Sequence, residues 1–288
     1  MKYFPKNYLS GFIVTVLLSG LLTNCGNQGN KNDELKGMDK SKVTEETLNQ
    51  ADVIEQALND VEKLDTEISQ NSKDARLYKN RSEAKEKLRD FTGALEDIQK
   101  AIELNPNDPG ILIKRGEIKT DMNDYQGAIA DFNKALEMTP GNLDAYRGRG
   151  TAKAKLNDYK GVIEDFTKII ERDAADNYVY RVRGNAYLWE NEYNKAIEDY
   201  SKAIEKNLSD AKAYNGRGFA RLWQKDYPGA LTDYQKALEL NLVDGEVYLG
   251  LGHAKYHTGN QEGACEAWKQ AAALGEIKAE ELIKENCK

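Results

Sequence analysis

The sequence predicts an all-α protein made of repeated helix-turn-helix units, and three observations lead to this prediction. A motif of 14 residues, such as "DYQGAIADFNKALE", recurs with starts at positions 124, 158, 192 and 226, so its period is 34 residues. Within each copy the apolar residues are three or four positions apart, which is the spacing of one helix face. Asp226, at the start of one copy, and Pro228 two residues later are typical of a helix N-terminus.

The first 24 residues predict a signal peptide that precedes the repeats. Lys2 and Lys6 are followed by an apolar run at 11–23, which is shorter than the ~20 residues that a membrane-spanning helix needs. The run ends in "LLTNC", which resembles the lipobox of bacterial lipoproteins, although Asn24 departs from the usual small residue. The resemblance implies that Cys25 is acylated, with palmitate among its fatty acids. An ordinary signal peptide that happens to contain a cysteine is the alternative.

Residues 25–43 predict a lipid-anchored flexible tether, because they are rich in Gly, Asn and Lys and lack apolar periodicity. The partner implied for this end of the chain is a lipid bilayer. The expected location is the bacterial cell envelope, with the anchor in the outer membrane and the repeats in the periplasm or outside. Residues 44–74 then predict an N-terminal capping helix. Its apolar stripe consists of Leu58, Val61, Leu64 and Ile68.

The register of the motif extends over six consecutive units of 34 residues without insertions. The units are 75–108, 109–142, 143–176, 177–210, 211–244 and 245–278. They resemble the tetratricopeptide repeat (TPR), and the resemblance covers 204 of the 288 residues. It implies a right-handed α-solenoid of six TPR units, each with a helix A and a helix B. Because the end units need a cover for their apolar faces, residues 279–288 are expected to form a C-terminal capping helix.

Arginine and aspartate recur together within the repeats. Position 7 of the first five units is Arg and position 23 is Asp, whereas the sixth unit has Leu251 and Ala267 at these positions. Since charge is paired with charge and apolar with apolar, we expect an ion pair between helices A and B of each of the first five units. Generic surface charges are the alternative. The expected structural pairs are Arg81–Asp97, Arg115–Asp131, Arg149–Asp165, Arg183–Asp199 and Arg217–Asp233.

Two cysteines remain once Cys25 is assigned to acylation. Cys265 and Cys287 form an even number of thiols in a chain that is expected to enter an oxidising compartment. Cys287 lies in the predicted capping helix and could reach back to Cys265. We therefore expect a disulfide between them, with two free thiols as the alternative.

The composition argues against a nucleic-acid partner and against catalysis. The formal net charge is −7, whereas nucleic-acid binders are usually basic. The sequence contains neither a nucleotide-binding loop nor a nucleophile elbow, and no cofactor or catalytic residue is predicted. His253 and His257 are four residues apart and could share a helix face, but two ligands do not make a metal site. A metal- or small-ligand-binding accessory factor, with Tyr256 beside the histidines, is the alternative function.

TPR proteins mostly bind peptides in a concave groove, and the resemblance implies which residues line it. The expected groove residues are Tyr178, Arg181, Asn185, Trp189, Asn215, Phe219, Trp223, His253 and Tyr256. Because exposed aromatic patches often mark binding sites, we expect Trp189, Phe219, Trp223 and Tyr256 to anchor a protein or peptide. The alternatives are that these rings pack between helices, or that the stack is a spacer without a ligand. The sequence is therefore interpreted as a non-enzymatic scaffold of the cell envelope, with its oligomeric state left open.

Overall fold

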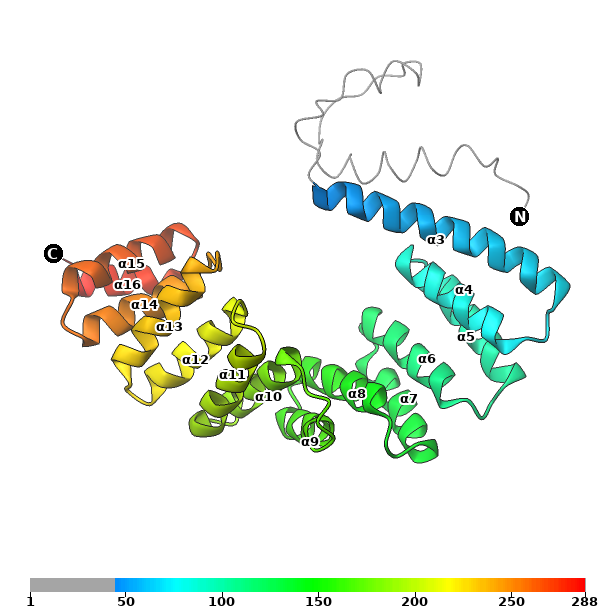
Figure 1. Cartoon of the computed structure of the whole chain (residues 1–288). Helices are drawn as coiled ribbons and strands as arrows, with labels where there is room; N and C mark the ends of the chain where they lie inside the picture. Colours follow the sequence, from blue (N-terminus) through cyan, green and yellow to red (C-terminus); the bar gives the residue numbers. More distant parts are fainter. Residues whose placement is uncertain (1–44, 288) are drawn as a thin grey trace, which may run out of the picture. The chain divides into compact units, whose positions relative to one another are not determined.

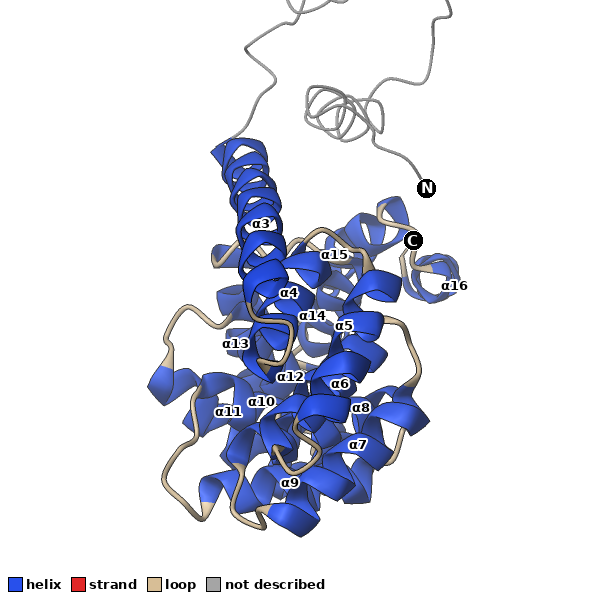
Figure 2. Ribbon diagram, turned by 90° about the vertical axis from the view of Figure 1, so that its right-hand side faces the viewer, coloured by secondary structure: helices blue, strands red, loops and turns tan. Residues whose placement is uncertain are grey.

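The computed structural model describes the backbone of residues 45–287 and the side chains of residues 52–287. The predicted signal peptide, Cys25 and the predicted tether lie outside this range. Within it, every regular element is an α-helix, and Figure 2 shows helices joined by loops only. None of the helices in this range combines the length and apolar character needed to cross a bilayer. The predicted all-α class is therefore confirmed.

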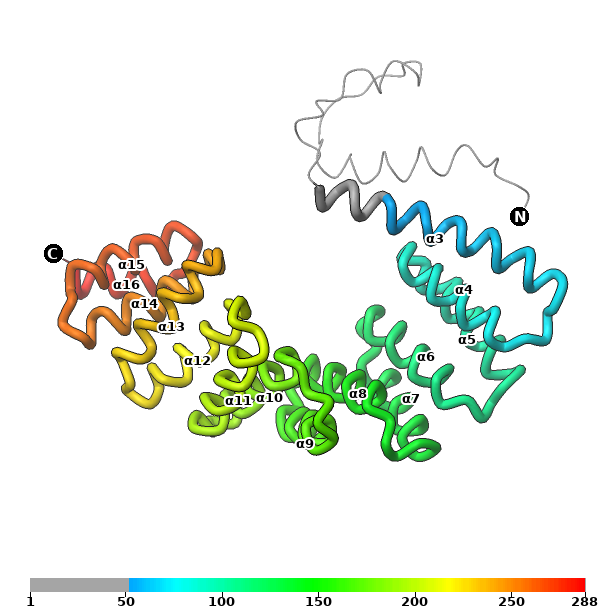
Figure 3. The backbone as a smooth tube through the Cα atoms, in the orientation of Figure 1, coloured from blue at the N-terminus to red at the C-terminus, as the bar shows by residue number. Residues whose placement is uncertain are grey.

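The described chain divides into two compact units, one ending at Ile118 and the other beginning at Lys119. The helices of the first unit are α3 (Glu45–Gln70), α4 (Ala75–Lys87), α5 (Phe91–Leu104) and the larger part of α6 (Pro109–Asp121). The long helix α3 runs beside α4, as Figure 3 shows. Its buried Ile68 joins Ile98 and Ile118 in one apolar core. Helix α3 thus covers the apolar face of the first helix pair.

The second unit is a succession of helices in which each packs on its neighbours in the chain (Figure 1). These helices are α7 (Tyr125–Met138), α8 (Leu143–Lys155), α9 (Tyr159–Ile170), α10 (Asn177–Trp189), α11 (Tyr193–Lys206), α12 (Ala211–Trp223), α13 (Tyr227–Glu239), α14 (Gly245–His257), α15 (Gln261–Ala273) and α16 (Ile277–Asn286). The even-numbered helices α8 to α14 are helix A of a repeat, and the odd-numbered ones are helix B. Helix α12 also contacts α10 and α14 directly, so these three helices A form one continuous layer.

The turn from helix A to helix B has the same construction in successive repeats. Asn157, Asn191 and Lys225 each adopt a left-handed backbone conformation, with φ of 60°, 61° and 64°, and Asn tolerates this conformation better than most residues. One residue after Lys225, the Asp226 carboxylate accepts a hydrogen bond from the Gly229 N–H at 3.0 Å. The sequence therefore ends one helix and caps the next within three residues.

Each helix B of the second unit carries one large buried ring that packs against helices A. These fully buried rings occupy repeat position 24 and belong to Phe132, Phe166, Tyr200, Tyr234 and Trp268. A Cβ atom at Gly216 of α12 or at Gly250 of α14 would collide with the tip of Tyr200 or Tyr234. The glycines therefore let the rings cross the layer of helices A, which locks neighbouring repeats together.

Candidate functional site

The predicted Arg–Asp ion pairs join helix A to helix B of the same repeat. In four of the five predicted pairs both residues belong to the same compact unit. In each of these pairs the Arg Nη2 donates to the Asp carboxylate at 2.5 to 2.8 Å. A second bond from Nε, at 3.0 Å between Arg217 and Asp233, makes the contact bidentate, and Asp233 is buried. The Arg115–Asp131 pair joins residues from different units and stays a prediction. In the sixth repeat Leu251 and Ala267 are both buried.

Sequence reasoning missed that these arginines also reach the preceding repeat. Nη1 of Arg217 donates to Ser201 at 3.0 Å, and Nη1 of Arg183 donates to Thr167 at 2.9 Å. The signal that could have revealed this is a polar residue at repeat position 25. Because their donors are engaged within and between repeats, these arginines stabilise the stack and are not available to a ligand.

A second cation at repeat position 11 supports the aspartate in most of these repeats. Arg221 Nη1 lies 2.7 Å from Asp233, and Lys153 Nζ lies 3.0 Å from Asp165. Repeat 177–210 has Tyr187 at this position instead. Burial raises the pKa of Asp199 in that repeat, and the hydrogen bonds from Arg183 oppose the increase. Asp199 therefore lacks the second cation that the other repeats place beside this aspartate.

The four aromatic residues expected to anchor a partner are all exposed on helices A of the second unit. The exposed fractions are 66% for Trp189, 44% for Phe219, 59% for Trp223 and 40% for Tyr256. We call these four residues the aromatic surface. Large apolar side chains at such exposures gain little from packing, so they are poor candidates for core residues.

Three stacked ring pairs connect the aromatic surface to the helices B behind it. In each pair the last residue of a helix A stacks on the first residue of the preceding helix B. The pairs are Trp189 on Tyr159 (centroids 5.8 Å apart), Trp223 on Tyr193 (6.1 Å) and His257 on Tyr227 (4.2 Å). We call this row the aromatic ladder. Since each ring is held by a neighbour, the ladder is a preorganised surface with one aromatic pair per repeat.

Three other expected groove residues are already engaged in contacts within the stack. Tyr178 is half-buried and lies 6.3 Å from the Phe166 ring. Arg181 Nε donates to Asp210 at 3.1 Å. Asn185 is exposed, and its Oδ1 accepts a hydrogen bond from the Tyr200 hydroxyl at 2.7 Å. Tyr178 therefore packs on the preceding repeat, whereas Arg181 and Asn185 are bonded within their own repeat. A ligand would have to compete for all three side chains.

Asn215 and His253 lie on the same layer of helices A, and both are half-buried. The His253 ring meets the edge of Trp268 at 5.7 Å, and burial, with a smaller effect of His257, lowers the pKa of His253. His257 is stacked on Tyr227. Within the described residues no group of three or more His, Cys, Asp or Glu could hold a metal ion. Both imidazoles thus serve aromatic packing, and no contact favours the alternative metal site.

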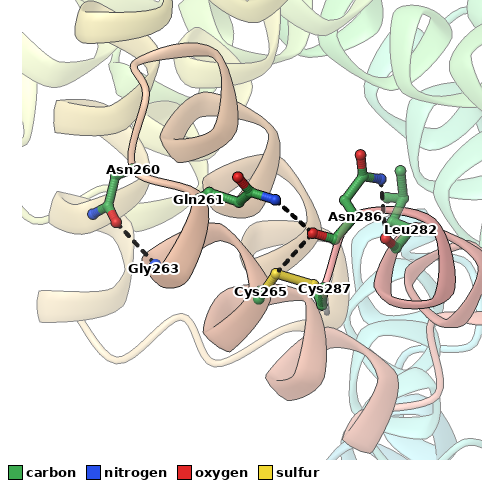
Figure 4. Close-up of a disulfide and its surroundings, with 7 residues drawn as sticks. All are labelled: Asn260, Gln261, Gly263, Cys265, Leu282, Asn286 and Cys287. Atoms are coloured by element: carbon green, nitrogen blue, oxygen red, sulfur yellow. Dashed lines mark hydrogen bonds between the residues drawn. A yellow bond between two sulfur atoms is a disulfide. The ribbon is translucent and has the colours of Figure 1, made fainter.

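A disulfide joins Cys265 on α15 to Cys287 directly after α16, with their Cα atoms 5.6 Å apart (Figure 4). The amide of Gln261 donates to the Asn286 carbonyl at 2.7 Å beside the disulfide. Helix α16 also places Leu282 and Ile283 against the core around Trp268. The last helix is therefore attached covalently and by packing to the repeat that it covers.

The fold and its surface define a class of protein, namely a stack of helix pairs that carries an exposed aromatic row. The chain belongs to the tetratricopeptide-repeat proteins, since TPR families match residues 75–108, 113–177, 184–225 and 211–241. A comparison with curated proteins finds no match.

Solved structures of TPR proteins have the same fold. YrrB, described as a TPR protein with an unusual peptide-binding site, has 21% identity and a TM-score of 0.58 over 65% of this chain and 97% of its own. MamA from Desulfovibrio magneticus RS-1 (residues 41 to the end) has 26% identity and a TM-score of 0.56 over 58% and 94%. The C-terminal part of a TPR protein from Cytophaga hutchinsonii has 20% identity and a TM-score of 0.63 over 81% and 95%.

Proposed function

We propose that this chain is a non-enzymatic scaffold of the bacterial cell envelope that binds a protein or peptide on its layer of helices A. The observation that carries the proposal is the aromatic surface, where Trp189 and Trp223 are more than half exposed although they are large and apolar. Aromatic side chains of this kind are the usual anchors of protein interfaces. The similarity to YrrB, a TPR protein whose described feature is a peptide-binding site, supports this choice of partner.

The aromatic ladder makes the surface suited to binding. The stacks hold the rings of Trp189 and Trp223 in place before a partner arrives. A partner therefore does not have to order these side chains, which reduces the entropic cost of association. A spacer without a ligand would gain nothing from exposed tryptophans, and the ladder favours the scaffold over the spacer.

Affinity capture from the cell envelope tests the interaction. The full-length chain is compared with the double variant Trp189→Ala/Trp223→Ala and with a control, Leu208→Ala/Val243→Ala. The control removes two side chains that are 70% and 62% exposed but lie in loops, outside the aromatic surface. We expect the wild type and the control to retain the same partner and the double variant to lose it. Equal capture by all three proteins would contradict the proposal.

The envelope location is a separate part of the proposal, and it rests on the lipobox-like sequence that ends at Cys25. An acylated Cys25 would tether the repeats to a membrane, and stable anchoring requires at least two acyl chains. Metabolic labelling with palmitate and membrane fractionation of Cys25→Ser test this part. We expect the variant to lose the label and to leave the membrane fraction. Retention of both would show that Cys25 is neither the acylated residue nor the membrane anchor.

A further inference from the structure

Two buried hydrogen-bond donors lie without a partner in the C-terminal repeats. Among the described residues, the Tyr234 hydroxyl and the Trp268 indole Nε1 are buried polar atoms with no hydrogen-bond partner. Both side chains are at most 1% exposed. Unpaired buried polar atoms are uncommon because each one loses its bonds to water. They lie in adjacent repeats at the same repeat position 24, so they are two donors with which a bound ligand could pair.

Comparison with Tyr200, one repeat earlier, shows where the Tyr234 hydroxyl points. Tyr200 crosses the layer of helices A beside Gly216, and its hydroxyl reaches the exposed Asn185. Tyr234 crosses the layer in the same way beside Gly250. The residue in register with Asn185 is Phe219, which offers no acceptor. The Tyr234 hydroxyl is therefore directed toward the aromatic surface, and none of the described residues supplies its acceptor.

Trp268 occupies the same repeat position in the sixth unit, but the glycine beside its ring belongs to helix A of its own repeat. Its ring lies against Gly252 of α14, and its neighbours are His253 and Tyr256 at 5.7 and 5.6 Å. The indole N–H can only donate a hydrogen bond. Burial raises the pKa of the Tyr234 hydroxyl, so this group also keeps its proton. The floor of the aromatic surface thus offers donors to a ligand rich in acceptors.

The spacing of the aromatic ladder restricts the shape of that ligand. Successive rungs are one repeat apart, and helices A that touch directly, as α10, α12 and α14 do, have axes about 8–10 Å apart. A polyproline II helix advances about 3.1 Å per residue, so every third residue returns to the same face after about 9 Å. Such a segment presents one ring per rung if proline occupies every third position. Its proline residues also supply carbonyl acceptors without an N–H group.

We propose that the partner segment is a proline-rich peptide in the polyproline II conformation, with a proline ring on each rung of the aromatic ladder and carbonyl oxygens facing Tyr234 and Trp268. This inference rests on the proposed function and specifies its partner. The exposed Phe219 rotates aside to uncover the Tyr234 hydroxyl, which is a side-chain adjustment of the kind that is common on binding.

Calorimetric titration of the full-length chain in detergent micelles tests the spacing. The probe is a 12-residue peptide of alanine with proline at every third position, and its control has the same composition with its prolines dispersed over all three faces of the helix. We expect the first peptide to bind at least about tenfold more tightly, and Trp223→Ala to weaken it by about 30-fold or more. Equal affinity for the two peptides would overturn the inference.

Two tyrosine variants test the donors. Tyr234→Phe removes an unpaired hydroxyl, so we expect an unchanged unfolding midpoint and about three- to tenfold weaker binding of the first peptide. Tyr200→Phe removes a hydroxyl that is bonded within the protein, so we expect a lower midpoint and unchanged binding. If Tyr234→Phe binds the peptide as tightly as the wild type, the assignment of this donor is wrong.

Two further probes separate this inference from the proposed function. The first probe is a set of peptides without the proline spacing that are selected for binding to the chain. If these peptides bind, lose binding in Trp223→Ala, and the proline peptide does not bind, the scaffold function stands and the inference fails. The second probe is an oligosaccharide of N-acetylglucosamine. If it binds the wild type but not Trp223→Ala, and no peptide binds, the ladder is a sugar-binding surface and both proposals fail.

Discussion

The Arg217–Asp233 pair gives the sharpest prediction about stability. Asp233 is 1% exposed, and it accepts bonds from Arg217 at 2.8 and 3.0 Å and from Arg221 at 2.7 Å. Asp233→Ala strands both guanidinium groups, which we expect to cost about 3–5 kcal/mol of unfolding free energy. Arg217→Leu leaves Asp233 with Arg221 and should cost about 2 kcal/mol.

The double variant Arg217→Leu/Asp233→Ala reproduces what the sixth repeat has, where Leu251 faces Ala267 and both are buried. Neither charge of the Arg217–Asp233 pair remains in it, and Arg221 keeps its contact with Asp226 at 3.5 Å. We therefore expect a total cost of at most about 2 kcal/mol. The two substitutions would then be coupled by about 3 kcal/mol or more. Urea unfolding followed by far-UV circular dichroism measures the four proteins of this cycle.

The control cycle uses Lys202 and Glu205, an ion pair with 55% and 63% exposed side chains. Its coupling should be much smaller than that of the buried pair, because exposed ion pairs contribute little to stability. If the costs of Arg217→Leu and Asp233→Ala simply add, the pair does not hold helices A and B together. The internal comparison among the repeats would then have misled us.

Three further predictions concern the C-terminal repeats. Trp223→Ala should lower the unfolding free energy by at most about 1 kcal/mol because the ring is mostly exposed, whereas Trp268→Ala should cost about 3–5 kcal/mol. Urea titrations measure both variants, and similar losses would show that Trp223 is a core residue. Cys265→Ser removes a disulfide between residues 22 positions apart, which should cost about 3 kcal/mol of unfolding free energy. The loss should appear as faster amide hydrogen exchange in α16, and unchanged exchange would contradict this prediction. The pKa of His253 is lowered in the folded protein, so the stability that it contributes is present above its unfolded pKa near 6.5 and is lost as the pH falls. Melting temperatures measured across this range should drop toward acid in the wild type and less in His253→Gln, and identical profiles would refute the assignment.

The 34-residue period predicted the fold because a repeat needs the same residue type wherever its helices meet in the same way. The joint change of positions 7 and 23 in the sixth unit, to Leu251 and Ala267, was enough to predict the ion pairs of the other units. Arg217 and Asp233 occupy the same repeat positions, 7 and 23, as this apolar pair. A repeated sequence thus contains its own internal comparison.

The register alone does not determine where a long side chain ends. Arg181 was expected to face a ligand, and its guanidinium instead reaches Asp210 of the same repeat. The stacking of Trp223 on Tyr193 was not predicted, because the two residues belong to different repeats and only the packing angle brings their rings together. Likewise, the missing acceptor for Tyr234 becomes evident only when Tyr200 is seen to donate to Asn185.

Photo-cross-linking in living cells tests most directly whether the aromatic surface contacts a partner. A benzoylphenylalanine residue replaces Phe219, which is 44% exposed on α12, or Leu208, which is 70% exposed in the loop before it. We predict a discrete light-dependent adduct of higher mass for the probe at 219 and none for the probe at 208. No adduct at 219, or the same adduct at both positions, would contradict the assignment of this surface as the binding site.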